Sequence, residues 1–184
     1  MNKHTQWVVT VFFLTAISAF ASTDLEADRK AIDQAHETTE AIRSHFKKSL
    51  QKAFKEKGAV GALGECKIQA PQMGVQTGTW EVGRTSHKLR NPSNQPRAWL
   101  KPLLEEYQKT PVSQHQKQRL VILGPQHYGY VEPIYVEAVC LNCHGAQISS
   151  EVQKELKGLY PQDQATGFKL GDFRGLIWLE SRSP

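Results

Sequence analysis

The sequence predicts an α+β fold, with an antiparallel β-sheet, a long N-terminal helix and flanking helices. Apolar residues recur at helical spacing through the first third of the chain, and short strand-like runs bounded by turn residues follow. The chain shows no internal repeat, low-complexity tract or domain-sized linker. We therefore expect a single domain, covering residues 22–184 once a short leader is removed.

The leader is predicted from the order of residue types at the N-terminus. Lys3 and His4 precede the uncharged run Trp7–Ile17, and Ala19-Phe20-Ala21 then forms a small-x-small cleavage site. This order is typical of a secretory signal peptide. The alternative is an uncleaved anchor, but the apolar run is short for a bilayer, which takes about 20 residues. We expect residues 1–21 to be removed after about Ala21, leaving a periplasmic protein without stable membrane insertion.

The long helix is predicted over Ser22–Lys57. Acidic residues crowd its first turn and lysines its last, which suits the helix dipole, and Gly58 provides a stop. Its apolar residues recur on one face: Leu25, Ile32, Ala35, Ile42, Phe46, Leu50 and Phe54. A second, short helix is expected over about Ala59–Ala70, ended by Pro71.

The later elements follow from turn residues and strand-like composition. A turn-rich loop is expected at Asn91–Pro96, and Pro102 is expected to kink or split the helix that follows. The Gly124-Pro125 turn separates two strand candidates, and a Gly-rich turn at Gly171–Gly175 precedes the last strand. The strands are predicted at Thr79–Leu89, Arg119–Leu123, Tyr128–Val136 and Leu176–Glu180, and the helices at Arg97–Lys109 and Glu151–Lys157.

The charge balance bounds the possible partners. The formal net charge is +5, and Lys3 is the only charged side chain within the expected leader. The basic residues are spread along the chain, without a dense block that interleaves with aromatic residues, which argues against nucleic acid as a partner. A mildly basic face could still dock an acidic redox partner.

The motif with the clearest chemistry is Cys140-Leu141-Asn142-Cys143-His144, the Cys-x-x-Cys-His pattern of c-type haem attachment. Two thiols three residues apart lie on one turn and can reach the two vinyl groups of one porphyrin edge. The next residue then lies under the ring, where the imidazole of His144 can bond the iron. The motif therefore predicts one covalent haem c, held by thioethers to Cys140 and Cys143.

Two other sites share part of this pattern. A zinc site would normally bring a second Cys or His pair at ligand spacing, and the sequence has none. A thioredoxin-like Cys-x-x-Cys belongs at the start of a helix, and the strand-like Tyr135–Val139 leaves that alternative open. The export signal favours haem, because c-type attachment takes place on the outer side of the membrane.

The second axial ligand is not determined by the residues alone. Besides Cys66, the candidates are Met73, His36, His45, His87, His115 and His127. His45, beside Phe46 on the long helix, is the strongest histidine, and Met73 would give a high potential. Cys66 is the odd cysteine of three and could equally be a small buried hydrophobe.

Three segments together resemble the PAS-like haem-binding c-type cytochrome family, which occurs as exported proteins and as the sensor part of receptors. They are Cys66-Lys67-x-x-Ala70-Pro71, Gly83-Arg84-Thr85-Ser86-x-Lys88-x-Arg90-Asn91-Pro92-x-Asn94-x-Pro96 and Cys140-Leu141-x-Cys143-His144-Gly145. The ending Gly167-x-x-x-Gly171-Asp172-x-x-Gly175 is similar too. The resemblance implies a PAS-like antiparallel sheet with helices.

The resemblance also implies roles for individual residues. Cys66 matches the second axial ligand of the family, giving a His144/Cys66 iron. Four further residues are implied to lie near the haem edge: Arg84, Lys88, Arg90 and Asn91. Arg84 and Arg90 are the expected partners of the propionates, because a guanidinium fork fits a carboxylate.

This ligand set leads to two expected functions. A thiolate ligand stabilises Fe(III) over Fe(II), so the first expectation is low-potential electron transfer or redox buffering with an unidentified redox protein. The alternative is a haem-based redox or gas sensor in which Cys66 is displaced and a separate partner protein receives the signal. A peroxidase-like enzyme would need a distal acid–base pair, and the sequence shows none, so we expect no enzymatic activity.

Overall fold

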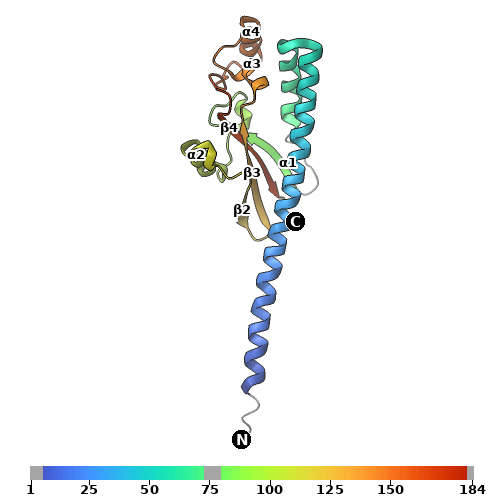
Figure 1. Cartoon of the computed structure of the whole chain (residues 1–184), viewed down its shortest axis with the longest axis vertical. Coiled ribbons are helices and arrows are strands. Elements are labelled where there is room, and N and C mark those ends of the chain that lie inside the picture. The colour runs from blue at the N-terminus through green and yellow to red at the C-terminus, as the bar shows by residue number, and fades with distance from the viewer. Residues whose placement is uncertain (1–5, 73–79, 182–184) are drawn as a thin grey trace.

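The computed structural model describes the backbone of residues 6–72 and 80–181, and the side chains of residues 26–64 and 80–181. Four antiparallel strands form one sheet, and α1 runs along it and extends well beyond it (Figure 1). The predicted α+β class, with an antiparallel sheet, a long N-terminal helix and flanking helices, is confirmed. Within the described part of the chain, none of the helices is both long and apolar enough to cross a bilayer.

The first element, α1, spans Gln6–Gln72 and is broken at Gly58. Gly58 has φ 67° and ψ −171°, a conformation that belongs almost entirely to glycine. The chain reverses there, so that residues 59–72 return beside the end of the first limb (Figure 1). The predicted stop at Gly58 is therefore confirmed. The helix begins at Gln6 rather than at Ser22, because the apolar run 7–17 continues the helix without a break.

The sheet has the order β1-β4-β3-β2, with the last strand of the sequence in the middle. The strands are β1 (Trp80–Thr85), β2 (Arg119–Gly124), β3 (His127–Tyr135) and β4 (Phe173–Ser181). Gly83 of β1 lies opposite Trp178 of β4, and a Cβ atom at Gly83 would approach the indole ring to 2.2 Å. The glycine therefore makes room for a large core side chain.

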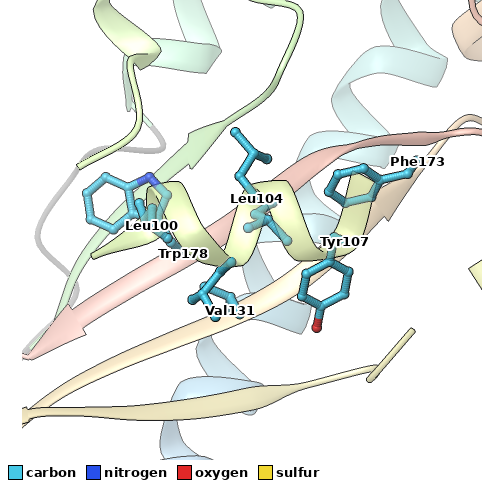
Figure 2. Close-up of a cluster of buried hydrophobic side chains, with 8 residues drawn as sticks. Leu100, Leu104, Tyr107, Val131, Phe173 and Trp178 are labelled. Atoms are coloured by element: carbon cyan, nitrogen blue, oxygen red, sulfur yellow. The ribbon is translucent and has the colours of Figure 1, made fainter. Parts of the chain in front are cut away.

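Each face of the sheet is covered by a helix, because successive strand residues point to opposite faces. On one face α2 (Leu100–Lys109) buries Leu100, Leu104 and Tyr107 against the sheet, as Figure 2 shows. On the other face, Ala31 and Ala35 of α1 pack against a second cluster, made of Trp80, Val82, Tyr130, Ile177 and Leu179.

Two short helices follow β3 at one end of the sheet: α3 (Leu141–His144) and α4 (Ser150–Leu159). The Ser149 side chain caps α4 by accepting a hydrogen bond from the backbone of Val152. Leu63, in the second limb of α1, packs against Val152 and Leu156 of α4. This contact brings the second limb next to the Cys-x-x-Cys-His turn.

Two local predictions need correction. Pro102 neither kinks nor splits α2, because it lies in the first turn, where the missing N–H would have had no helical partner. The first strand ends at Thr85 rather than at Leu89, because its ladder with β4 stops at the pair Thr85–Leu176 and Ser86 bonds β4 through its side chain instead. Ser86 Oγ donates a hydrogen bond to the carbonyl of Arg174 at 2.6 Å.

Candidate haem site

A cavity lies between α1, one end of the sheet and the Cys-x-x-Cys-His turn. It holds about 1000 Å³ of empty space, counting the part open to solvent. From α1 it is lined by Phe46, Leu50, Phe54 and Leu63, so the apolar face of the predicted helix points into it. The other described residues of the wall are apolar side chains, uncharged polar side chains, the residues of the Cys-x-x-Cys-His turn and three arginines.

The predicted attachment residues all line this cavity. Cys140 ends a short 3-10 turn (Ala138–Cys140), and α3 then carries Cys143 and His144 on the next turn of backbone. Neither cysteine is in a disulfide. The two thiols and the imidazole are therefore presented to one space by one turn, as haem attachment requires.

His144 is held in a defined tautomer. Its Nδ1–H donates a hydrogen bond to the carbonyl of Ala165 at 2.6 Å, which leaves the lone pair of Nε2 to bind a metal. Burial, followed by the nearby guanidinium groups of Arg174 and Arg90, lowers the pKa of His144 well below its usual value. A neutral imidazole of this tautomer is the form that binds haem iron.

The turn is tied to the loop 163–168 by its backbone as well. Gly167 N–H donates to the carbonyl of Gly145, and Phe168 N–H donates to the carbonyl of His144. A Cβ atom at Gly145 would meet the carbonyl oxygen of Leu141 at 2.6 Å. Gly145 is therefore required by the end of α3 itself.

Arg90 binds this same assembly. Its guanidinium forms an ion pair with Asp163 at 3.0 Å and donates hydrogen bonds to the carbonyls of Cys143 at 2.5 Å and Ala165 at 3.4 Å. Both charged side chains are about nine-tenths buried. Asp163 in turn accepts a hydrogen bond from the N–H of Ala165 at 2.8 Å. Arg90 thus joins the motif to the loop that orients His144.

Of the other three residues implied near the haem edge, one lines the cavity and two do not. Arg84 of β1 lines the cavity, as Arg90 does. Lys88 donates a hydrogen bond to the carbonyl of Thr166 at 3.2 Å, and its Nζ lies 5.0 Å from the centre of the Phe168 ring. The side chain of Asn91 caps a 3-10 turn by accepting from Ser93 N–H. Lys88 and Asn91 are not among the residues that line the cavity.

The structure adds one residue that the sequence analysis missed. Arg174 lines the cavity, and burial, followed by the charges of Arg84 and Arg90, lowers its pKa to about 9. It lies within the ending Gly167–Gly175 that carried part of the resemblance, at a position that the pattern leaves unspecified. Its nearness to Arg84, whose charge acts on it across the cavity wall, is a feature of the folded chain that the sequence does not indicate.

Only some of the candidates for the second iron ligand lie within the described residues. Cys66 belongs to the second limb of α1, but its side chain lies outside the described residues, as does Met73. Among the residues described around the cavity, His144 is the only histidine. Three other candidates have partners elsewhere: His36 with Glu132, His115 with Tyr135, and His127 with Glu180. His87 stacks on Phe173.

Comparisons with known proteins agree with this architecture. The model of the Tll0287-like family (Tll0287) matches residues 21–181. A solved structure, the crystal structure of the cyanobacterial heme-protein Tll0287, superimposes with a TM-score of 0.61 at 22% sequence identity, covering 84% of this chain and 98% of that one. No curated protein matches the chain. Because the family model spans most of the sequence, this chain belongs to the Tll0287-like family.

Proposed function

We propose that this protein is an exported, single-haem c-type cytochrome. Cys140 and Cys143 hold the haem through thioethers, and His144 binds its iron through Nε2. Bound in this way, the haem supplies one-electron exchange at its iron. The chain's own contribution is to attach, orient and enclose the group within the apolar face of α1.

The observation that carries this proposal is the state of His144. The Ala165 carbonyl accepts the Nδ1–H, so Nε2 is the nitrogen available to a metal, and both attachment cysteines line the same cavity. The apolar wall that α1 gives the cavity suits a macrocycle. The solved relative of similar fold is itself named a heme-protein.

For the second ligand we propose Cys66. The second limb of α1, which carries it, packs on α4 next to the haem motif. A thiolate paired with histidine favours Fe(III), so the protein is suited to low-potential electron transfer or redox buffering in the periplasm.

A redox or gas sensor is the second candidate, and the break in α1 favours it. Cys66 lies on the limb beyond Gly58, separated from the sheet-bound part of the helix by one non-helical residue. If Cys66 left the iron, the second limb of α1 could move. A partner protein could then detect the change where this limb contacts α4.

The covalent link is tested by replacing both Cys140 and Cys143 with Ala. We expect the wild-type band to retain haem peroxidase stain after denaturing electrophoresis and the variant band to lose it, because only thioether bonds survive denaturation. His127→Ala, which changes a histidine bonded to Glu180, is the matched control and should stain like wild type. Stain that persists in the double variant would contradict the proposal.

The second ligand is tested by Cys66→Ala. We expect the haem to stay attached, the ferric thiolate spectrum to disappear and the midpoint potential to rise by more than about 60 mV, the shift that marks a tenfold change for a one-electron couple. The measurements are ferric electron paramagnetic resonance and a spectroelectrochemical titration. An unchanged resonance and potential would exclude Cys66.

The sensor and the carrier are distinguished by adding carbon monoxide to the reduced wild-type protein. Uptake of carbon monoxide favours the sensor, and a spectrum that carbon monoxide does not change favours the carrier.

A further inference from the structure

The wall of the haem cavity carries an unbalanced charge. Three arginines line it, Arg84, Arg90 and Arg174, while none of the described lining residues is an aspartate or glutamate. Arg90 is balanced from behind by Asp163, at 3.0 Å. Arg174 therefore faces a space that contains no protein carboxylate among the described residues that line it.

Arg174 is held in place by hydrogen bonds and by an aromatic ring. Its Nη1 donates hydrogen bonds to Ser86 Oγ at 2.6 Å and to the carbonyl of Lys88 at 3.2 Å, and its guanidinium lies 5.1 Å from the centre of the Phe168 ring. These partners are all uncharged. In the part of the chain that the structure describes, no carboxylate forms an ion pair with Arg174.

Such an arrangement is costly unless an anion completes it. A cation taken out of water is retained in proteins mainly where it is paired, and hydrogen bonds to neutral oxygens restore only part of its lost hydration. The neighbouring charges of Arg84 and Arg90 add repulsion, which together with burial lowers the pKa of Arg174 to about 9. An anion in the cavity would remove both penalties.

We propose that Arg174, together with Arg84, forms an anion-binding subsite that holds a carboxylate of the group bound in this cavity. A guanidinium matches a carboxylate with two parallel hydrogen bonds, and Arg174 is fixed from behind by Ser86 and Lys88. This inference rests on the proposed function, because haem brings two propionate carboxylates. The proposal pairs one propionate with Arg174 of β4 and Arg84 of β1. Arg90 instead positions the Cys-x-x-Cys-His turn.

The test uses the full-length holoprotein with Arg174→Gln and Arg174→Lys. The control is Arg119→Gln, which removes an arginine that is paired with Glu106 and does not line the cavity. Loss of the cation leaves an uncompensated carboxylate near the iron, which favours Fe(III). We expect a more negative midpoint potential in Arg174→Gln, an intermediate value in Arg174→Lys and the wild-type value in Arg119→Gln. If the midpoint potential of Arg174→Gln equals that of Arg119→Gln, the proposed subsite is wrong.

The source of the carboxylate is decided by repeating the titrations at equal ionic strength in chloride, acetate and inorganic phosphate. A haem carboxylate gives the same Arg174→Gln shift in every buffer, whereas a free anion gives a wild-type potential that depends on the buffer. Thermal unfolding in the same buffers reports on the subsite even if haem is not attached. A wild-type band without haem stain would contradict the proposed function. In that case, an unfolding temperature that depends on the anion in wild type but not in Arg174→Gln would still support the subsite. A wild-type unfolding temperature that does not depend on the anion would overturn the subsite.

Discussion

At the scale of single residues, the site depends on side chains that act on backbone. Asp163 accepts the N–H of Ala165, and the Ala165 carbonyl accepts the Nδ1–H of His144. Arg90 bonds Asp163, Ala165 and Cys143 together. The orientation of the imidazole is therefore set through Ala165, which both members of the Arg90–Asp163 ion pair hold in place.

The first prediction concerns this ion pair. Arg90→Gln and Asp163→Asn should each lower the free energy of unfolding by about 3–5 kcal/mol, because each leaves one buried charge without its partner. The double variant should cost clearly less than the sum, since it removes both charges. The measurement is a double-mutant cycle by denaturant unfolding of the holoprotein. Additive costs would mean that the two side chains do not act as a pair.

At the scale of elements, the break in α1 matters most. Without it, a 67-residue helix would carry Cys66 far from the haem motif, whereas the reversal at Gly58 returns the second limb to α4. A Cβ atom at Gly58 would meet nothing within 4 Å, so the glycine is required by its backbone conformation alone. This makes the position a clean test of backbone strain.

The second prediction is that Gly58→Ala destabilises the protein by about 1–3 kcal/mol, the usual cost of placing a side chain in this conformation. Gly64→Ala is the matched control, because Gly64 lies within the second limb and also has open space around it. There alanine should be neutral or should stabilise by up to about 1 kcal/mol. Thermal or denaturant unfolding of both variants measures the difference. Equal effects would show that Gly58 does not hold the reversal.

At the scale of the whole molecule, α1 is joined to the sheet by a buried charge as well as by apolar packing. Glu132 of β3 is 4% exposed and bonds His36 Nδ1 at 2.8 Å, Arg43 Nη2 at 2.6 Å and the Tyr130 hydroxyl at 2.6 Å. Two of these partners lie on α1. The network fixes where the helix crosses the sheet and hence where its apolar face meets the cavity.

The third prediction is a pH dependence of stability. The hydrogen bond from His36 to the Glu132 carboxylate raises the pKa of His36 above its usual value of about 6.5. Its contribution is therefore fully present below about pH 6.5 and is lost as pH rises through the pKa of the folded state. The effect should be modest, because half of the His36 side chain is exposed.

The measurement is the free energy of unfolding from about pH 5.5 to about pH 8.5, for wild type, His36→Gln and His45→Gln. His45 is an exposed histidine on the same helix and serves as the control. Wild type and His45→Gln should lose stability relative to His36→Gln as pH rises. A constant difference between wild type and His36→Gln across this range would contradict the prediction.

Several features of this protein follow from interactions between residues that are close together in sequence. The apolar period of α1, the stop at Gly58, the β2–β3 hairpin around Gly124 and the Cys-x-x-Cys-His turn depend on residues close together in the chain, so their patterns could be read directly. The strand order, with β4 in the centre, depends on pairing between residues some 90 positions apart. Arg174 and Arg84 also come close only in the folded chain, and a long-range hydrogen bond gives His144 its tautomer. The proposed attachment chemistry thus depends on five adjacent residues that can be read from sequence. The charge and shape of the cavity were decided by tertiary contacts, because burial and electrostatic fields depend on what lies nearby in space.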